Sequence, residues 1–452
     1  MKPPMDRLLE SSPDELARLL RERGAGRGWF LRGDEGWQAS SPWLDPIRTW
    51  LPDCDADDDH EAVFLAVGPE SGCLFGAFLH RTARGPGQGG LRRARYASCA
   101  GFLRDGLRLA RAMTLKNALA GLWWGGGKGL IARPEGVDDE APGFRRTMYR
   151  EYGDFVSSLR GCYVTAEDAG TRPQDVAHIF ERSRFVTCIP EEMGGSGNPA
   201  RDTARGIVCG METALAFGGL GDLGGKRVAI QGVGAVGQAL IELLLGHEVD
   251  AIVAAETSTG RHAELCASNL AALHDARLTL RLAAEGDDSI LAENCDVLAP
   301  CAMGGVLGPE TIPMVRARIV CGAANNMLLD DDRDATALAA GGIIYVPDFV
   351  VNRMGIVRCA DEHLGRLQPD PLVERQLDPS YAHGIPAVVS RVLEEANQSG
   401  RPTPRVAADW ADTLSREPHP LAGHRATQII HSLTRNGWHQ EDGEDDGEGT
   451  LV

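Results

Sequence analysis

The sequence predicts a two-domain α/β protein whose second domain is a doubly wound parallel sheet. Three observations lead to this prediction. The chain has 452 residues, more than a single hydrophobic core normally holds. In its second half, apolar strand-like runs alternate with helical patterns, which is typical of a parallel sheet covered by helices on both faces. A glycine-rich turn at 232–237 follows one of these apolar runs.

In the first half, helical and strand-like patterns are mixed. Short apolar runs bounded by turn residues predict strands, and longer amphipathic runs predict helices. Ser12 is a candidate N-cap for the first helix. The expected order is helix 13–23, strands 62–67 and 73–80, helix 105–122, strand 130–133, helix 145–159 and strand 162–165, with glycine-rich stretches at 85–90 and 125–127.

In the second half, a loop at 194–202 precedes a helix, and strands and helices then alternate. The expected order is helix 203–217, a strand and helix within 226–244, strands at 251–256, 295–300, 318–324 and 342–348, and helices from roughly 380 to 437.

The composition limits the classes of partner. The net charge of −18 argues against nucleic acid, because a backbone binder needs a basic face. The eleven cysteines include no C-x-x-C pair, and we expect reduced thiols in a cytoplasmic protein. No signal peptide or membrane span is expected, and no metal site, because the histidines show no H-x-x-x-H spacing.

The segment Gly232-Val233-Gly234-Ala235-Val236-Gly237 lies between a predicted strand and a predicted helix. This is the context that a G-x-G-x-x-G turn needs to bind a dinucleotide. Gly232 permits the tight turn, Gly234 lets the backbone approach the pyrophosphate, and Gly237 lets helix and strand pack closely. The free N–H groups of the helix N-terminus favour the phosphates. We therefore expect a Rossmann-type domain.

Glu256 ends the next predicted strand. A carboxylate there accepts a hydrogen bond from the ribose 2′-hydroxyl and repels a 2′-phosphate. The cofactor expected is therefore NAD, although the nearby Arg261 could serve a phosphate.

Three charged residues are candidates for catalysis. Lys116 and Lys128 are embedded in apolar and glycine-rich sequence, where desolvation lowers the pKa of an ammonium and makes a usable base. Asp168 follows the predicted strand 162–165, and active-site residues of doubly wound enzymes gather at the C-terminal ends of strands. An aspartate there is otherwise a helix cap.

Together these motifs resemble the Glu/Leu/Phe/Val dehydrogenase family, with a pattern nearest to its leucine and phenylalanine branch. The resemblance runs from about 61 to about 415. It is carried by GPGQGGLR (85–92), MTLKNALAGL (113–122), GGGKG (125–129), TAEDAG (165–170), SGNP (196–199), QGVGAVG (231–237), APCAMGG (299–305), GAANN (322–326), PDFVVN (347–352) and ADE (360–362).

The resemblance implies NAD-dependent oxidative deamination of an L-amino acid to a 2-oxo acid and ammonia. It implies that Lys128 activates water and that Asp168 shuttles protons. It also implies substrate contacts for Lys116, Gly89, Gly90 and Asn326, of which Lys116 pairs with the α-carboxylate. Asn326 is in addition expected near the nicotinamide ribose, and Thr203 is expected to bond the nicotinamide amide.

The substrate side chain is less well defined. Ile356 and Cys359 match apolar positions that line the family's side-chain pocket, which favours an aliphatic or aromatic side chain. Gln88 stands where the leucine-type enzymes carry an apolar residue and the glutamate-type enzymes a lysine. Arg353 and Arg358 also depart from the leucine-type pattern, and both are expected to face outward.

Two other functions stay open. The chain could act on an acidic or unusual amino acid, read by Gln88 and an arginine, or it could be a non-catalytic NAD-binding sensor with the same fold. Turnover of amino acids by the wild type separates the sensor from the enzyme.

The expected domain plan has five parts and an active site in the cleft between the two domains. The parts are an N-terminal extension (1–50), a substrate-binding and catalytic domain (51–199), a Rossmann NAD-binding domain (200–361), C-terminal helices packing back on the first domain (362–437) and an acidic tail (438–452). The resemblance also implies a homo-oligomer.

Overall fold

The computed structural model describes residues 7–23, 26–54, 59–268, 270–365 and 367–440. The chain divides into two compact units. Unit 1 consists of Met1–Thr114, Trp123–Gly197 and Ser415–Val452, and unit 2 of Leu115–Leu122 and Asn198–Leu414.

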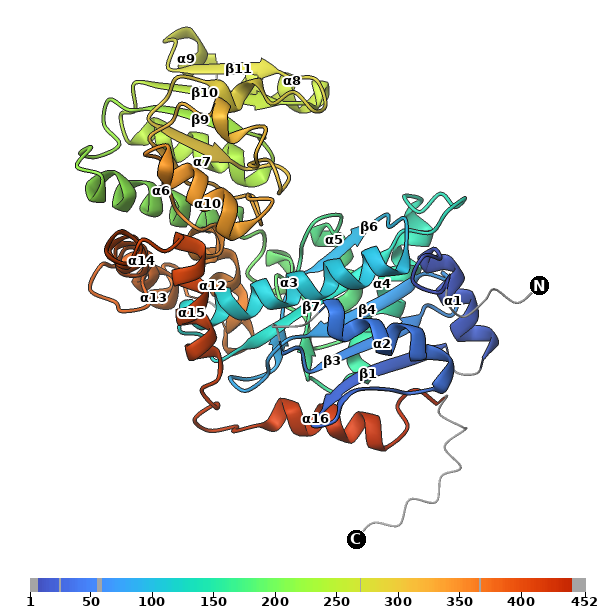
Figure 1. Cartoon of the computed structure of the whole chain (residues 1–452). Coiled ribbons are helices and arrows are strands. Elements are labelled where there is room, and N and C mark those ends of the chain that lie inside the picture. Colours follow the sequence, from blue (N-terminus) through green and yellow to red (C-terminus); the bar gives the residue numbers. More distant parts are fainter. Residues whose placement is uncertain (1–6, 24–25, 55–58, 269, 366, 441–452) are drawn as a thin grey trace. The chain divides into compact units, whose positions relative to one another are not determined.

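Unit 1 is built on a mixed sheet (Figure 1), which has eight strands among the described residues. Its strands are β1 (Arg27–Gly33), β2 (Gly36–Ala39), β3 (Ala62–Val67), β4 (Leu74–Leu79), β5 (Gly87–Gln88), β6 (Leu91–Ala94), β7 (Gly125–Ala132) and β8 (Tyr163–Val164). Their order is β2-β1-β3-β4-β7-β5-β8, with β6 also paired to β7. The pairs from β2 to β7 are antiparallel, whereas β5 and β6 run parallel to β7 and β8 runs parallel to β5.

Helices cover both faces of this sheet. The helical segments of unit 1 are α1 (Pro13–Glu22), η2 (Pro42–Leu44), α2 (Asp45–Cys54), the part of α3 (Cys99–Leu119) up to Thr114, α4 (Pro142–Ser158), α5 (Pro173–Phe180), η3 (Glu191–Met193) and α16 (Arg425–Arg435). On one face, Phe64 and Phe75 pack with apolar side chains of α4 and α16. On the other, Phe30 and Phe78 pack with α1, α2 and α3. The predicted N-cap is present, because the Ser12 hydroxyl accepts from the Glu15 N–H.

The glycines at 125–127 form part of a central strand, β7, and not only a turn between elements. A side chain at Gly125 would meet the Arg81 carbonyl oxygen at 2.3 Å, and one at Gly126 would meet the Thr114 hydroxyl at 2.0 Å. The glycines are therefore needed because the neighbouring backbone and α3 approach too closely for any Cβ.

Unit 2 contains a parallel sheet with six strands among the described residues. The strands are β9 (Arg227–Gln231), β10 (Ala251–Glu256), β11 (Leu278–Leu282), β12 (Val297–Pro300), β13 (Ile319–Val320) and β14 (Ile344–Tyr345). Their order is β11-β10-β9-β12-β13-β14, and every pair is parallel. This is the 3-2-1-4-5-6 order of a Rossmann domain, in which ligands bind where the order reverses, here between β9 and β12.

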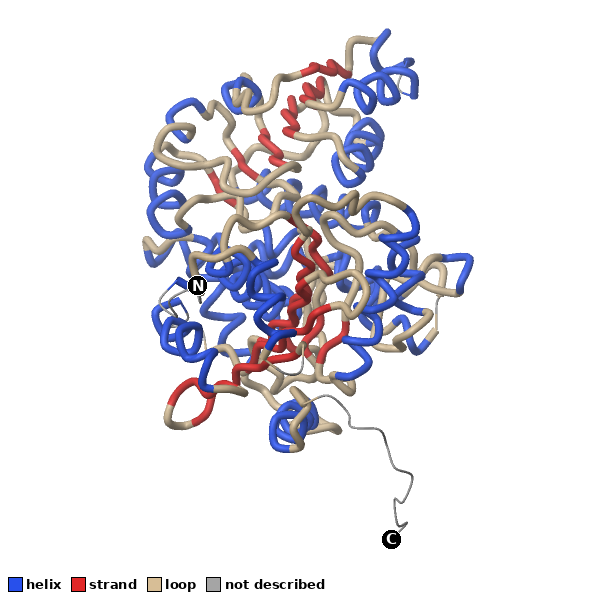
Figure 2. Tube along the Cα trace, turned by 90° about the vertical axis from the view of Figure 1, so that its right-hand side faces the viewer, coloured by secondary structure: helices blue, strands red, loops and turns tan. Residues whose placement is uncertain are grey.

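Helices flank the strands of this sheet (Figure 2). The helical segments of unit 2 are α6 (Ala200–Phe217), α7 (Ala235–Gly246), α8 (Thr259–Ser268), α9 (Leu270–His274), η4 (Ser289–Ala292), η5 (Ile312–Met314), α10 (Asp331–Ala340), α11 (Asp348–Val351), α12 (Met354–Ala360), η6 (Glu362–Leu364), α13 (Pro371–Glu374), η7 (Arg375–Leu377), α14 (Ile385–Ser399) and α15 (Thr403–Ser415). Strand β11 was not expected from the sequence, because it lies at the sheet edge and Leu282 is 50% exposed there. Among the described residues, none of the helices is long and apolar enough to cross a membrane.

The division into units differs from the expected domain plan at both ends of the chain. The described residues of the segment 1–50 are an integral part of unit 1 and not an extension, because β1 pairs with β3 and α1 and α2 contribute to the core. The helices up to Leu414 belong to unit 2, where α14 packs on α6, and only the segment after them returns to unit 1. The expected tail at 438–452 begins in the core, since Trp438 is buried there, and 441–452 lie outside the described residues.

Candidate active site

In unit 1, Lys128 and Asp168 form a buried ion pair. Lys128 lies on β7 and is 4% exposed. Its ammonium donates a hydrogen bond to Asp168, which follows β8 and has a side chain that is 22% exposed. The glycine strand brings the lysine into the sheet, and the end of the neighbouring strand brings the carboxylate. The structure thus joins two of the predicted catalytic residues.

The pKa values of the pair are set by burial and by opposite charges. Burial lowers the pKa of Lys128, although the charge of Asp168 opposes this effect. Burial alone would raise the pKa of Asp168, but the charges of Lys128 and Arg92 outweigh it and hold this pKa at about 2. The carboxylate is therefore ionised at neutral pH, and the lysine is the member of the pair that can release a proton.

Arg92 is a third member of this group, and the sequence did not single it out. Its Nε lies 3.7 Å from the Asp168 carboxylate, and its Nη1 donates to Asp105 at 3.2 Å. Tyr96 donates a further hydrogen bond to Asp105 at 2.9 Å. No local pattern indicates this role, because it depends on the contact of Arg92 with Asp168, which lies far along the chain.

Gly89 and Gly90 allow the strands around this pair to approach closely. A Cβ at Gly89 would lie 1.7 Å from the Gly127 carbonyl oxygen, and one at Gly90 would lie 2.7 Å from the Asp168 Cβ. Any side chain at Gly90 would therefore displace Asp168. The expected substrate contact of these glycines stays a prediction.

Gln88 lies on the same face of the sheet as Lys128. It pairs with Gly126 of β7, and Lys128 follows two residues later along that strand, so the two side chains point the same way. Gln88 is 1% exposed, and neither polar atom of its amide has a hydrogen-bond partner among the described residues. An unsatisfied amide at this place costs free energy, which makes it a candidate contact for another molecule.

Glu167 is a titratable neighbour that the sequence analysis did not use. Its Oε2 atom is buried and has no hydrogen-bond partner among the described residues. Burial, with the negative charges of Asp168 and Asp175, raises its pKa to about 7.

In unit 2, Lys116 belongs to a cluster of amide and carboxylate side chains. Its ammonium donates to the Asn325 side chain at 2.7 Å, and Asn352 donates to the same oxygen at 3.1 Å. Asp348 accepts from the Asn326 backbone N–H at 2.9 Å. Asn325, which was not singled out from the sequence, is thus bonded to Lys116, and the expected contacts of its neighbour Asn326 with substrate and ribose stay predictions. The pair of asparagines was visible in the sequence, but which of them faces the lysine depends on the left-handed backbone of Asn326, with φ at 53°.

The glycine turn of unit 2 has the geometry that a dinucleotide requires. Gly232 has φ at 87° and closes the turn, and a Cβ at Gly237 would lie 2.3 Å from the Gly232 carbonyl oxygen. By contrast, the space around Gly234 is open to 4 Å. Helix α7 begins at Ala235, so its free N–H groups face this turn.

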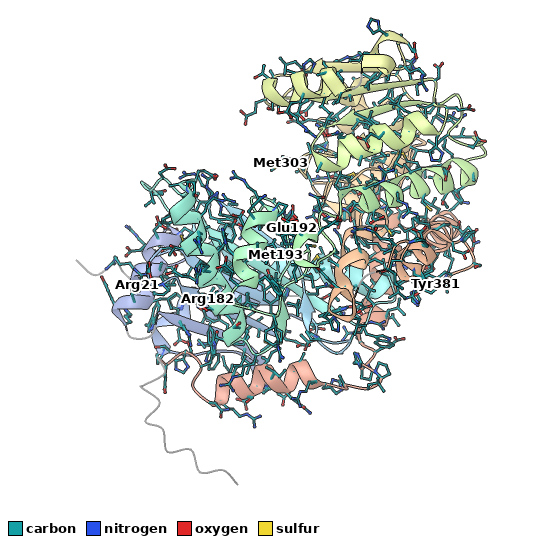
Figure 3. The ribbon with its side chains drawn as sticks, turned by 180° about the vertical axis from the view of Figure 1, so that it is seen from behind. Arg21, Arg182, Glu192, Met193, Met303 and Tyr381 are labelled. Carbon is teal, nitrogen blue, oxygen red and sulfur yellow. The ribbon has the colours of Figure 1, made fainter. Side chains whose placement is uncertain are left out.

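The turn opens on a pocket of about 640 Å³ at the end of the sheet. Its lining includes Gly232, Val233, Gly234, Glu256 and Met303. Met303 is 79% exposed on the loop after β12 (Figure 3). Pocket, turn and helix end together fit a dinucleotide, and the expected binding elements are therefore in place.

Glu256 lies beside the turn as predicted. Its carboxylate accepts from the N–H groups of Val233 at 3.1 Å and of Thr257 and Ser258 at 2.9 Å each. Arg261 lies beside the same turn, where its Nε donates to the Val233 carbonyl oxygen at 3.2 Å, and it pairs with Glu264 at 3.4 Å. Three further acids line the same pocket: Glu285, Asp287 and Asp288.

The remaining predicted contacts of unit 2 lie near α12. The Thr203 hydroxyl donates to the Pro199 carbonyl oxygen at 3.1 Å. Ile356 is half-buried and Cys359 is buried, one turn apart on α12.

The two arginines do not both face outward as expected. Arg353 is fully buried, and Arg358 pairs with Asp202 at 2.7 Å with a side chain that is 23% exposed. The sequence pattern could not show this, because the acceptors of Arg353 lie 23 and 30 residues further along the chain, at Gln376 and His383.

These features define a class of protein: an oxidoreductase with a dinucleotide-binding domain and a buried lysine–aspartate pair. Comparison with known families shows which oxidoreductase family the chain resembles. Residues 194–414 match the family described as glutamate/leucine/phenylalanine/valine dehydrogenase, and residues 75–184 match the dimerisation domain of Glu/Leu/Phe/Val dehydrogenases.

Individual relatives agree with the family match. A leucine dehydrogenase of Thermoactinomyces intermedius is 36% identical over 355 residues, which cover 78% of this chain and 89% of that protein. A valine dehydrogenase of Streptomyces albus is 39% identical over 311 residues, covering 67% and 79%. The crystal structure of L-tryptophan dehydrogenase from Nostoc punctiforme superposes with a TM-score of 0.62 at 29% identity, covering 80% of this chain and 98% of that one.

The chain therefore belongs to the glutamate/leucine/phenylalanine/valine dehydrogenase family. It is an amino-acid dehydrogenase that uses a nicotinamide dinucleotide. The resemblance seen in the sequence and the two-domain α/β fold are confirmed, and neither the acidic-substrate nor the sensor alternative is favoured.

Proposed function

We propose that this chain oxidatively deaminates an L-amino acid with a neutral, aliphatic or aromatic side chain, using NAD. The observation that carries the proposal is the buried Lys128–Asp168 pair, because it offers a base and a proton carrier within one hydrogen bond of each other. The overall reaction converts the amino acid, NAD⁺ and water into the 2-oxo acid, ammonium, NADH and a proton.

In this proposal Lys128 is the base. When bound, the nicotinamide accepts the hydride from the substrate Cα. Lys128 in its neutral form removes a proton from the water that adds to the resulting imine carbon. Asp168 accepts and returns the proton at the nitrogen, and Arg92 keeps that carboxylate ionised beforehand.

Lys116 is proposed to hold the substrate α-carboxylate. Its ammonium donates a hydrogen bond to the neutral side-chain amide of Asn325 at 2.7 Å. An incoming carboxylate can therefore add a charge-assisted hydrogen bond. Gly89, Gly90 and Asn326 are proposed as further substrate contacts, and Thr203 as a contact of the nicotinamide amide.

NAD is proposed over NADP because of the charge around the pocket. Glu256 is held beside the glycine turn by three backbone N–H groups, and three more acids line the same pocket. Arg261 is near enough in sequence to serve a 2′-phosphate, but its guanidinium already contacts Val233, Gln238 and Glu264. The acids of the pocket would therefore repel a 2′-phosphate, and Arg261 could compensate for this repulsion only by giving up its present contacts.

The neutral side chain is supported by Ile356, Cys359 and the uncharged Gln88, and by the names of relatives that act on leucine, valine, phenylalanine and tryptophan. The test is a panel of L-amino acids followed by NADH or NADPH formation, and of 2-oxo acids with ammonia in the reverse direction. We expect turnover of leucine, valine, phenylalanine or tryptophan with NAD. Turnover restricted to glutamate or aspartate would contradict the proposal.

We also propose a homo-oligomer formed through unit 1, because residues 75–184 match a domain described by its dimerisation. Light scattering on the purified full-length chain tests this. A cytoplasmic location is proposed from the eleven free thiols, since such thiols persist in a reducing compartment.

A further inference from the structure

Arg353 is the largest fully buried side chain of the described residues. It precedes α12, and its Nη2 donates to the His383 carbonyl oxygen and, at 3.3 Å, to Oε1 of Gln376. Both acceptors are neutral. Residues 353, 376 and 383 all belong to unit 2.

The burial of the Arg353 guanidinium lowers the stability of the folded protein. Among the described residues, its Nε and Nη1 atoms have no hydrogen-bond partner, and no carboxylate forms an ion pair with it. Burial lowers the pKa of Arg353 to about 9. Because a buried charge without a counter-charge destabilises a fold, the arginine is poorly explained as a device for stability alone.

The acceptors of Arg353 lead to the end of α3, which carries Lys116. Gln376, itself fully buried, donates through Nε2 to the Ala120 carbonyl oxygen at 2.9 Å. The Ala120 N–H in turn donates to the Lys116 carbonyl oxygen at 3.0 Å. The backbone of Lys116 is thus linked to Arg353 through one amide side chain and one helical hydrogen bond.

The ring of His383 supports the same helix end. Its Nδ1 lies 3.3 Å from the Leu119 carbonyl oxygen. Gly121 follows with φ at 69°, and a Cβ there would come within 2.9 Å of the His383 ring. The loop 376–383 therefore closes over the last turn of α3 at a place where only glycine leaves room.

A second path returns from the ammonium of Lys116 to the same arginine. Lys116 donates to Asn325, and Asn352 donates to that same oxygen. Asn352 directly precedes Arg353 in the chain. The backbone and the ammonium of Lys116 are thus tied to adjacent residues, and the hydrogen bonds form a closed circuit within unit 2.

We propose that Arg353 and Gln376 are positioning residues that hold Lys116 in place to receive the substrate carboxylate. The inference rests on the proposed role of Lys116. Arg353 touches no reacting atom and acts through Gln376 and the end of α3.

The experiment compares R353M, R353K and Q376L with wild type in steady-state kinetics and thermal unfolding. We expect R353M and Q376L each to raise KM for the amino acid about tenfold, the equivalent of about one hydrogen bond, with KM for NAD unchanged. R353M should keep or raise the Tm, because an apolar side chain of similar length replaces an uncompensated charge. R353K should have a KM for the amino acid between those of R353M and wild type. The R353M/Q376L double variant should have a KM no higher than that of the more affected single variant, since both substitutions break the same path.

R375M is the matched control. Arg375 directly precedes Gln376, but its guanidinium lies over the ring of Tyr381, 4.9 Å from the ring centre. Its KM for the amino acid should stay at the wild-type value. An unchanged KM in both R353M and Q376L would overturn the inference, as would a parallel rise of KM for NAD with a fall in Tm.

The K116M variant distinguishes a failure of the positioning role of Arg353 and Gln376 from a failure of the proposed role of Lys116. If K116M raises KM strongly while R353M and Q376L do not, Lys116 keeps its role and the positioning inference fails. If K116M leaves KM unchanged, the proposed role of Lys116 fails, and the inference falls with it.

Discussion

The ammonium of Lys128 on β7 donates a hydrogen bond to the carboxylate of Asp168 beyond β8, and Arg92 lies 3.7 Å from that same carboxylate. Two cations therefore share one anion in a buried place. The arrangement keeps Asp168 ionised and makes Lys128 the group whose proton is most easily released.

Replacing Asp168 with Asn removes the proton carrier but keeps its size. We expect kcat for deamination to fall by roughly two to four orders of magnitude, the usual contribution of a general acid–base group. NAD binding, measured by fluorescence titration, should be unchanged because the glycine turn lies in unit 2. A D168N enzyme with wild-type kcat would remove Asp168 from the mechanism.

The pH dependence of deamination should report the charge of Arg92. The proposed mechanism requires neutral Lys128, so kcat should rise with pH through the lowered pKa of that lysine. The positive charge of Arg92 contributes to this lowering, and its removal in R92L should move the rise to higher pH. The control is R108L, because Arg108 also pairs with Asp105 but is 58% exposed. A profile of R92L that coincides with that of wild type would contradict this electrostatic role.

Glu167 should make stability depend on pH. Its pKa is raised from 4.5 to about 7 in the folded protein, so the folded state retains a proton that the unfolded chain releases above 4.5. Stability from this group is complete below 4.5 and is lost as pH rises to about 7. The Tm of E167Q minus that of wild type should therefore increase between pH 4.5 and 7 and level off above. If the Tm difference between E167Q and wild type does not change between pH 4.5 and 7, the raised pKa of Glu167 is contradicted.

Glu256 should decide the choice of cofactor. E256Q keeps an oxygen for the Val233 N–H and removes the charge, so we expect kcat/KM with NADP to rise about tenfold, in line with the loss of one repulsive charge near a phosphate. E242Q is the control, since Glu242 lies on α7 outside the pocket lining and pairs with Arg201, with a side chain that is 47% exposed. Equal cofactor ratios in E256Q and wild type would move the discrimination to the other acids of the pocket.

Gln88 should influence the choice of side chain. In Q88L an apolar group replaces a buried amide without partners, and we expect kcat/KM for leucine to rise about tenfold, while a polar substrate of similar size such as asparagine gains nothing. The measurement is the ratio of kcat/KM for the two amino acids. A ratio unchanged by the substitution would show that Gln88 does not face the substrate.

Much of the site was visible in the sequence because it depends on short segments. The glycine turn, Glu256 after the next strand, and the pair of lysines beside glycines each have a local spacing that the chemistry requires. Arg92, Asn325 and Gln376 were missed because their importance arises from contacts across the fold, at Asp168, Lys116 and Ala120.

The sequence by itself determined the fold class, the family and the two residues proposed for catalysis, because strand and helix periods and the glycine spacings are properties of neighbouring residues. Only the tertiary structure decided which residues complete each group. It turned Arg353 inward against the expectation, made 1–50 part of the first sheet and kept the helices up to Leu414 with unit 2. The physical reason is that burial and charge pairing depend on residues far apart in the chain, which no local pattern records.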